Sequence, residues 1–309
     1  MFAKLSNNSN IKSILLISLS NIGDVILTFP VLDRVKATFP DAEISVLVGV
    51  KGKSLFDGNP HIRRTITYDK QMPIGLKWKW FLELRREHFD LVVDLRNSML
   101  PFLLNAKYMT FPALGPSREH MREKHLKRLY SVLPEPLVPL KHYALIPPEH
   151  AARDIKANVH GLKDYILIAP GAADQKKRWT AAGFAALIRH FLHEGGRQVV
   201  IVGDQKDRLF AEEILKGLPG GIINISGLTT LLELAGVIER AALCVTNDSG
   251  IMHMASYLDR PIVALFGPTD PELYGPWSTT SRVVQSATKV MGDIAVENVV
   301  MAVREVARA

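Results

Sequence analysis

Short apolar segments without polar alternation recur along the chain, and each is followed by a turn and then by a segment with helical spacing. Continuous apolar runs of this kind are typical of strands buried on both faces of a parallel sheet. In the first half, the pattern predicts strands over residues 13–19, 43–48, 64–68 and 90–95, with a turn at residues 20–24 after the first. Helices are predicted over residues 25–39, 51–58, 74–88, 98–105 and 119–133, the first of which must accommodate Pro30.

The same alternation resumes after a proline-rich interval. Residues 133–148 contain five prolines and are expected to form a linker or crossover. Beyond it, strands are predicted over residues 165–169, 198–202, 222–225, 243–245 and 262–266, and helices over residues 180–194, 204–216, 229–240, 250–258 and 293–308. Repeated strand-helix units indicate an α/β protein with doubly wound sheets. We therefore expect two α/β domains, residues 1–150 and 151–309, meeting across a cleft.

Thr246, Asn247, Asp248, Ser249 and Gly250 form a turn between a predicted strand and a predicted helix. In open α/β sheets ligands bind at the carboxyl ends of strands, and a helix N-terminus there favours an anion. The backbone N–H groups of Ser249, Gly250 and Ile251 are candidate donors to a phosphate or diphosphate. Gly250 would let the phosphate approach the backbone closely.

Three consecutive cations follow another predicted strand end. Lys176, Lys177 and Arg178 come after the Pro-Gly-Ala turn at residues 170–172, so they are expected at the same sheet edge. Cations there can neutralise a departing diphosphate without a metal. The alternative is a solvated basic loop. Trp179 is expected to pack in the interior, ahead of a helix capped by Thr180.

The composition indicates which classes of partner and which cellular compartment to expect. The formal charge of +7 favours anionic partners. No reader helix, zinc site or aromatic RNA motif accompanies this charge, so a nucleic-acid partner is not expected. The single Cys244 lies in a predicted strand, which excludes a disulfide framework and fits a reduced, cytoplasmic setting. No apolar run approaches the ~20 residues that cross a bilayer.

Three motifs identify a family resemblance. The segments IGDVILTFPVLDRVKATFPDAEI, APGAADQKKRW and NDSGIMHMASYLDRPIVALFGPTDP resemble those of the lipopolysaccharide heptosyltransferases, glycosyltransferase family 9. The resemblance covers nearly the whole chain. It implies a GT-B fold of two Rossmann-like domains facing across a cleft. Residues 1–150 would bind the acceptor and residues 151–309 the nucleotide-sugar.

The same resemblance implies an activity. The chain would transfer a heptose from ADP-heptose to the inner core of lipopolysaccharide or to a lipid A precursor, inverting the anomeric configuration. It would need no metal and no cofactor beyond its donor substrate. Such an enzyme would be cytoplasmic and peripheral to the inner membrane. The identities of the nucleotide and the sugar rest on the resemblance alone.

By resemblance, Asp24 is the catalytic base that deprotonates the acceptor hydroxyl. Asp24 follows the first predicted strand, where a base facing a cleft should lie. The alternative is that Asp24 merely caps a helix beginning at Val25. Lys177 is the phosphate contact of the family's K-x-W pattern, and Arg178 is an ancillary one.

The resemblance also assigns the remaining donor-binding residues. Asp248 would cap the helix or accept hydrogen bonds from donor hydroxyls. His253 matches the NDSG-x-x-H spacing and would bind phosphate, although a lone helical histidine is more often a packing residue. Gly227 and Leu228, which precede another helix at a strand end, would lie near the nucleotide base.

One departure from the family and one basic segment leave questions open. Family members commonly carry a basic residue in the first strand, where this chain has Ser18. Residues 118–128 hold five cations, namely Arg118, Arg122, Lys124, Lys127 and Arg128. This segment could engage an acidic lipid head group or a phosphorylated acceptor. It could equally be a solvated helix face.

The chain lacks the nucleotide-binding motifs of two other enzyme classes. A nicotinamide dehydrogenase would show G-x-G-x-x-G after its first strand, and a P-loop enzyme G-x-x-x-x-G-K-[ST]; the chain has neither. A nucleotide-sugar epimerase of the same architecture is the nearest enzymatic alternative. A non-catalytic nucleotide-sugar or glycolipid binding protein is the alternative from a different class.

Overall fold

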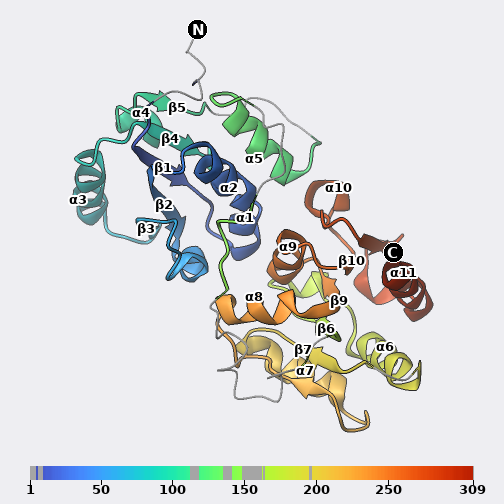
Figure 1. Cartoon of the computed structure of the whole chain (residues 1–309). Helices are drawn as coiled ribbons and strands as arrows, with labels where there is room; N and C mark the ends of the chain where they lie inside the picture. The colour runs from blue at the N-terminus through green and yellow to red at the C-terminus, as the bar shows by residue number, and fades with distance from the viewer. Residues whose placement is uncertain are drawn as a thin grey trace. The chain divides into compact units, whose positions relative to one another are not determined.

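The computed structural model describes residues 5, 10–111, 118–134, 141–147, 162, 164–194 and 197–308. The chain divides into two compact units, Met1–Ile146 and Pro147–Ala309 (Figure 1). The expected boundary after residue 150 lies close to this division, although residues 135–140 and 148–150 of the expected linker fall outside the described residues. Each unit is an α/β structure with its own sheet.

The first unit is built on a five-stranded sheet in the order β3-β2-β1-β4-β5, with every pairing parallel. Its strands are β1 (Ser13–Ile17), β2 (Glu43–Gly49), β3 (Arg64–Tyr68), β4 (Leu91–Asp94) and β5 (Tyr108–Met109). The sequence predicts the first four. The sequence does not predict β5, because a two-residue strand is too short to give an apolar pattern.

Helices cover both faces of this sheet (Figure 1). They are α1 (Ile22–Ile26), α2 (Phe29–Thr38), the 3₁₀ helix η1 (Val50–Phe56), α3 (Ile74–Arg85), α4 (Leu100–Leu103) and α5 (Met121–Tyr130). On one face, side chains of α3 and α4 pack against Leu15, Ile17, Leu47 and Val92 of the strands. Helices α2 and α5, which contact each other, lie on the opposite face.

The predicted helix over residues 25–39 is wrong, because the structure contains two helices there. The Thr28 hydroxyl donates to the carbonyl of Val25 at 2.6 Å, which ends α1, and Thr28 is the N-cap residue of α2. Pro30 then lies in the first turn of α2, where its missing N–H leaves no hydrogen bond unmade. Helix α1 begins within the predicted turn at residues 20–24, so Asp24 lies inside a helix.

The second unit is built on a six-stranded parallel sheet in the order β11-β10-β9-β6-β7-β8. Its strands are β6 (Tyr165–Ala169), β7 (Val199–Ile201), β8 (Ile223–Asn224), β9 (Ala241–Asn247), β10 (Ile262–Phe266) and β11 (Ser281–Gln285). Five of them match predicted strands. The sequence does not predict β11, since this edge strand is largely exposed and lacks a continuous apolar run.

Its helices are the 3₁₀ helices η2 (Gln175–Lys177), η3 (Gln205–Asp207) and η4 (Met291–Asp293), and α6 (Ala181–Glu194), α7 (Arg208–Leu215), α8 (Leu231–Glu239), α9 (Gly250–Tyr257), α10 (Pro271–Tyr274) and α11 (Val296–Arg308). Side chains of α6, α7 and α11 fill one face of the sheet. Thr180 accepts from the N–H of Gly183 at 3.0 Å and caps α6, and Trp179 is buried, as predicted.

Each sheet has one position where the chain reverses its direction of strand addition. In the first sheet it lies between β1 and β4, and in the second between β6 and β9. Ligands of open α/β sheets bind outside the carboxyl ends of the strands at such positions. The expected ligand positions are therefore the sheet edge that follows β1 and β4 and the sheet edge that follows β6 and β9.

In the part of the chain that the structure describes, no helix combines the length and the apolar character needed to span a membrane.

Cys244 lies in the middle of β9 and is completely buried, as the sequence predicts. Burial raises the pKa of its thiol to about 12. Because the thiolate is the reactive form, we expect the native protein to react with a thiol reagent at pH 8 at least ~100-fold more slowly than the guanidinium-unfolded protein. The chain has one cysteine, so the absorbance change reports this site alone. Equal rates for native and unfolded protein would contradict the burial of Cys244.

Candidate functional site

One buried amide side chain ties the ends of β6 and β9 together. Asn247, the last residue of β9, accepts a hydrogen bond from the N–H of Trp179 at 3.2 Å. Its amide group donates to the carbonyl of Pro170 at 2.6 Å. Since a buried amide without partners costs about 1–3 kcal/mol, these two bonds favour a single position for the loop that follows β6. Asn247 therefore fixes the geometry of the second sheet at its reversal point.

The loop held by Asn247 carries Lys177, whose ammonium group forms an ion pair with Asp248. The distance from Lys177 Nζ to Asp248 Oδ2 is 2.7 Å, and the Thr269 hydroxyl donates to the same oxygen at 2.7 Å. The Asp248 side chain is 5% exposed, whereas that of Lys177 is 28% exposed. An ammonium has three N–H donors, and this ion pair uses one of them. Asp248 thus holds a partly accessible cation at the carboxyl ends of β6 and β9.

The N-terminus of α9 lies next to this ion pair in sequence. Ser249 is the N-cap residue of α9, but its side chain does not bond to the helix. Its hydroxyl oxygen is buried and has no hydrogen-bond partner among the described residues. Nor do the backbone hydrogen bonds of the described residues use the N–H groups of Ser249, Gly250 and Ile251. These unused donors and the Lys177 ammonium form a donor set suited to an anion.

The prediction that Asp248 caps the helix is wrong. Its carboxylate accepts from Lys177 and Thr269 instead, and Ser249 occupies the N-cap position. The other predicted role, hydrogen bonding to donor hydroxyls, stays a prediction.

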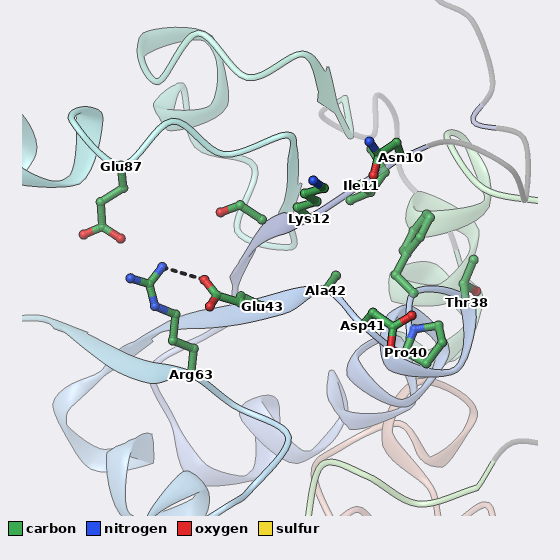
Figure 2. Close-up of a pocket in the computed structure, with 12 residues that line it drawn as sticks. Asn10, Ile11, Lys12, Thr38, Pro40, Asp41, Ala42, Glu43, Arg63 and Glu87 are labelled. Carbon is green, nitrogen blue, oxygen red and sulfur yellow. Dashed lines mark ion pairs between the residues drawn. The ribbon is translucent and has the colours of Figure 1, made fainter.

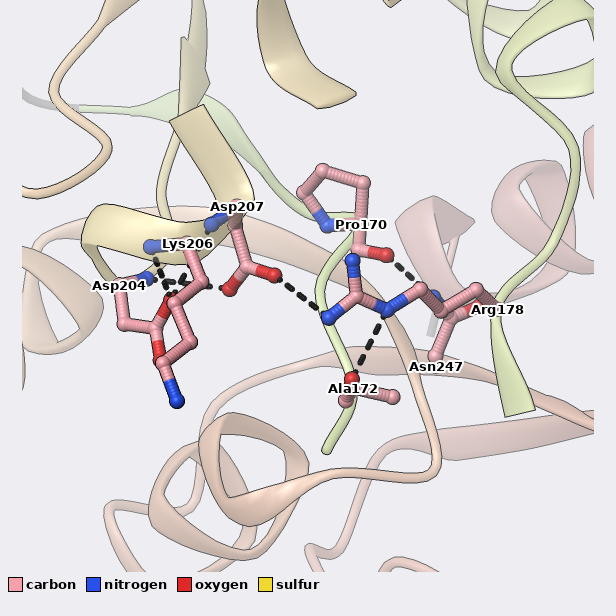
Figure 3. Close-up of polar contacts among 7 residues, drawn as sticks. All are labelled: Pro170, Ala172, Arg178, Asp204, Lys206, Asp207 and Asn247. Carbon is pink, nitrogen blue, oxygen red and sulfur yellow. Dashed lines mark hydrogen bonds and ion pairs between the residues drawn. The ribbon is translucent and has the colours of Figure 1, made fainter. Parts of the chain in front are cut away.

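The Arg178 side chain is held by other groups of the protein (Figure 3). Its Nε donates to the carbonyl of Ala172 at 2.8 Å, and its guanidinium lies 3.0 Å from Oδ1 of Asp207. The guanidinium carbon also lies 5.9 Å from the ring centre of Phe210. Arg178 therefore links the loop after β6 to the loop after β7, and an ancillary phosphate contact stays a prediction.

Asp207 is packed tightly where these two loops meet. It forms a capping box with Asp204, in which each side chain accepts from the other's backbone N–H. A Cβ atom on Gly171 would lie 2.1 Å from Oδ2 of Asp207, and one on Gly203 would lie 2.8 Å from its Cβ. Burial raises the pKa of the Asp207 carboxyl above its ordinary value. Burying the carboxylate charge costs free energy, and the ion pair with Arg178 offsets part of that cost.

Gly227 and Leu228 lie at the same sheet edge, after β8. Gly227 has a φ of +75°, a left-handed backbone conformation that favours glycine, and a Cβ there would lie 3.0 Å from the Cα of Gln205. Leu228 is exposed. In the sheet order, β7 separates β8 from β6. The structure therefore places these two residues at the predicted edge, two strands away from Lys177, and their proximity to a base stays a prediction.

His253 is buried within α9. Its ring stacks on that of Trp277 with centroids 5.7 Å apart and an interplanar angle of 23°. The stacking on Trp277 shows that the His253 ring is packed inside the protein. A contact between His253 and phosphate stays a prediction.

In the first unit, Asp24 lies beside the reversal point between β1 and β4. It is half-buried in the first turn of α1, and its Oδ2 accepts from the side-chain amide of Asn21 at 3.0 Å. Asn21 is the N-cap residue of α1, so the alternative in which Asp24 caps a helix starting at Val25 is wrong. Asp24 keeps carboxylate lone pairs for a further hydrogen bond. The role of catalytic base stays a prediction.

Ser18 is completely buried just after β1. The single hydroxyl proton of Thr28 is donated to Val25, so Ser18 donates to Thr28 Oγ1 across 2.8 Å. Ser18 therefore binds the end of β1 to the junction of α1 and α2, where a charged side chain would be buried.

Structural contacts account for three of the five cations at residues 118–128. Arg122 pairs with Glu123 and Lys127 with Glu119. Arg128 donates to the carbonyl of Asp94 at 3.1 Å. These contacts favour the alternative in which the cations lie on a solvated helix face and bind neighbouring groups of the protein. A role in acceptor binding stays a prediction.

A cavity of about 720 Å³ lies at the opposite edge of the first sheet, where β1 and β2 begin (Figure 2). Its lining includes Lys12, Asp41 and the ion pair between Arg63 and Glu43. Because it opens at the amino ends of the strands, it is not the ligand position expected of this fold.

Sequence reasoning missed three residues of the candidate site, Asn247, Thr269 and Asp207. Asn247 and Thr269 lie inside the motifs NDSG and GPTDP, so the motifs contained the signal, but only the structure shows which groups they contact. Asp207 lies in a predicted helix with no motif around it.

The Arg178–Asp207 pair makes a prediction about stability. Arg178→Ala leaves the Asp207 carboxylate buried without its cation, so we expect the free energy of unfolding to fall by about 2–3 kcal/mol at pH 7. The folded-state pKa of Asp207 is already raised, and the variant should raise it further. The Arg178→Ala variant should therefore be stable at low pH, where Asp207 is protonated, and should lose stability as the pH rises through the folded-state pKa of Asp207. Urea unfolding at pH 5 and pH 7 measures this, with Asp207→Asn in the same background as the control that restores stability. A loss independent of pH and of Asp207 would contradict the pairing.

Comparison with known proteins confirms the family resemblance. Residues 116–300 match the model of the family described as glycosyltransferase family 9 (heptosyltransferase). The chain is 27% identical over 310 residues to lipooligosaccharide heptosyltransferase 2 of Haemophilus influenzae, and the match covers 88% of each chain.

Two solved structures are similar to the chain over almost its full length. One is the E. coli ADP-heptose lps heptosyltransferase II, with a TM-score of 0.78 and 27% identity over 96% of this chain and 98% of that one. The other is the glycosyl transferase family 9 of Veillonella parvula, with a TM-score of 0.84 and 24% identity over 98% and 99% of the two chains. The predicted GT-B fold class, with two parallel-stranded α/β domains, is confirmed. The chain belongs to glycosyltransferase family 9, the heptosyltransferases, and is a glycosyltransferase.

Proposed function

We propose that the protein transfers a heptose from ADP-heptose to the inner core of lipopolysaccharide or to its lipid A-linked precursor. The observation that carries the proposal is the donor set at the end of β6 and β9: the Lys177 ammonium held by Asp248, beside the unused donors at the start of α9. The names of the relatives supply the sugar and the acceptor. The epimerase and the non-catalytic binding protein are not favoured, because the family and these relatives are heptosyltransferases.

The reaction proposed is a direct displacement with inversion. Asp24 takes the proton of the acceptor hydroxyl, whose oxygen then bonds to the anomeric carbon of the heptose. The bond from that carbon to the β-phosphate oxygen breaks, and ADP leaves with the electron pair. Lys177 and the N–H groups of Ser249 and Gly250 stabilise the negative charge that develops on the diphosphate. No metal or other cofactor takes part in this proposal.

The domain roles and the location follow from the same proposal. Residues 1–150 bind the acceptor, and residues 151–309 bind the donor. Since the acceptor is built on a lipid, the protein acts at the cytoplasmic face of the inner membrane as a peripheral protein. The charge of +7 supports attraction to an anionic surface.

Asp24→Asn tests the catalytic base. The amide keeps the size and the hydrogen bond of Asp24 but cannot take a proton, so kcat should fall by about 10²–10⁴ while the Kd for ADP stays unchanged. The measurement is transfer from ADP-heptose to heptose-deficient lipopolysaccharide, followed by mass spectrometry. The matched control is Asp41→Asn, at the opposite edge of the same sheet, which should keep full activity. Unchanged turnover in Asp24→Asn would mean that another group is the base.

Lys177→Ala tests the diphosphate contact. Loss of this cation should raise the Kd for ADP by about 10–100-fold, because a charge-assisted hydrogen bond is worth about 1.5–3 kcal/mol. Calorimetric titration with ADP, UDP and GDP, with and without magnesium, measures the affinity. Lys176→Ala, the exposed neighbouring cation, is the control and should bind ADP normally. Magnesium-dependent binding, a preference for UDP or equal affinity in both variants would contradict the proposal.

A further inference from the structure

Large exposed apolar side chains of the first unit are concentrated on two helices. Among its described residues, all of them except Val50 lie in α3 or at residues 99–103. These are Ile74, Leu76, Trp78 and Leu82 of α3, and Met99, Phe102 and Leu103 at and within α4. Exposed apolar side chains scattered singly are ordinary, but a concentration of them marks an interaction surface.

Three of these side chains form one stripe along α3. Ile74, Trp78 and Leu82 are spaced four residues apart, so they project from the same face of the helix. They are 88%, 63% and 37% exposed. The opposite side of α3 is also apolar, since Leu84 is buried and Trp80 packs against the sheet. The stripe is therefore a second apolar face that the core of this unit does not need.

Cations accompany the stripe. Residues 74–86 contain Lys77, Lys79, Arg85 and Arg86 against the single carboxylate of Glu83. Lys77 donates to the carbonyl of Lys70. In the described part of the chain, Lys79, Arg85 and Arg86 are exposed and take part in no ion pair. A tryptophan and aliphatic side chains beside unpaired cations match the chemistry of a bilayer surface that carries anionic head groups.

The size of the stripe argues against a second protein as the occupant. The three side chains of the stripe extend over only about 12 Å of helix, which favours a shallow contact over the ~800 Å² per partner that a stable protein interface buries. Insertion into a lipid surface has no such threshold, because each large apolar side chain and each flanking cation contributes separately.

The position of the two helices also fits a lipid-linked acceptor. Helix α3 follows β3 and α4 follows β4, so both start on the side of the sheet where strands end, as does α1 with Asp24. Both pack on the same face of the sheet, away from α2 and α5 (Figure 1). Contact through α3 would place the start of this helix, at the sheet edge that also carries Asp24, against the membrane.

We propose that the stripe Ile74-Trp78-Leu82 of α3, together with Lys79, Arg85 and Arg86, is the surface that docks the protein on an anionic lipid bilayer. Residues 99–103 provide a second apolar contact. This inference rests on the proposed function in one respect: a lipid-linked acceptor is the reason to expect a membrane as the partner. Docking itself requires neither donor nor transfer.

Vesicle flotation in the absence of substrates tests the proposal. The purified full chain should float with vesicles that mix phosphatidylglycerol with phosphatidylcholine, and less with phosphatidylcholine alone or at high salt. Trp78→Ser/Leu82→Ser should lower the affinity by about tenfold or more. Lys79→Glu/Arg86→Glu should abolish the preference for anionic vesicles. All substituted side chains are exposed, and a control variant, Leu209→Ser/Met301→Ser, removes exposed apolar side chains from the second unit and should bind normally.

Tryptophan fluorescence provides a second readout. Trp78 is the exposed member of four tryptophans, and Trp179 is buried. Vesicles should shift the emission of the wild type to shorter wavelength, and Trp78→Phe should lose most of this shift while it still floats.

Three outcomes would overturn the proposal: no flotation of the wild type, equal flotation of the α3 variants, or equal loss in the control variant. A dimer that dissociates in Trp78→Ser/Leu82→Ser without any vesicle binding would also overturn it and assign the stripe to a second copy of the chain. Failure of heptose transfer with vesicle binding intact would contradict the proposed function alone.

Discussion

The side chain of Asn247 is the interaction on which the candidate donor site depends. Hydrogen bonds of a parallel sheet align β6 with β9 only as far as the strands extend, and the loops beyond them have no ladder to hold them. Asn247 replaces that ladder by binding the start of the loop at Pro170 and its end at Trp179. Trp179 is itself locked in the core through its indole N–H, which donates to the carbonyl of Ile294. The loop between these two fixed points then presents Lys177 to Asp248 at the place where doubly wound sheets bind ligands.

Two neighbouring cations of this loop serve different purposes. Lys177 ends a 3₁₀ turn and reaches the carboxyl end of β9, whereas Arg178 has extended backbone geometry and turns toward β7. The planar guanidinium suits the second task, because it binds a carbonyl and a carboxylate at once and also lies over an aromatic ring. A point charge on a flexible stem suits the first. The site therefore combines a rigid support around Asp207 with one cation that remains partly accessible.

The sequence predicts the parts of this fold that bury apolar surface on both faces, and fails where burial is partial. Buried strands such as β1, β6 and β10 give continuous apolar runs, so their positions follow directly from the pattern. The exposed edge strand β11 and the two-residue β5 give none. The helix break at Thr28 depends on a side-chain hydrogen bond that periodicity does not encode. In the candidate site, motifs locate Lys177, Asp248 and Ser249, but the pairing of Asp248 with Lys177 and the use of Arg178 as a support depend on contacts between loops distant in sequence.

The central claim is that a nucleoside diphosphate binds where β6 and β9 end, on the unused donors beside Lys177. Amide hydrogen exchange, followed by mass spectrometry of peptides with and without ADP, tests it most directly, since it reports the backbone N–H groups themselves. The account predicts slower exchange in the presence of ADP at residues 249–251 and in the loop 170–179. It predicts no change at residues 10–13 and 38–43, which line the cavity at the amino edge of the first sheet. Protection by ADP at that cavity, with none at residues 249–251, would contradict the account.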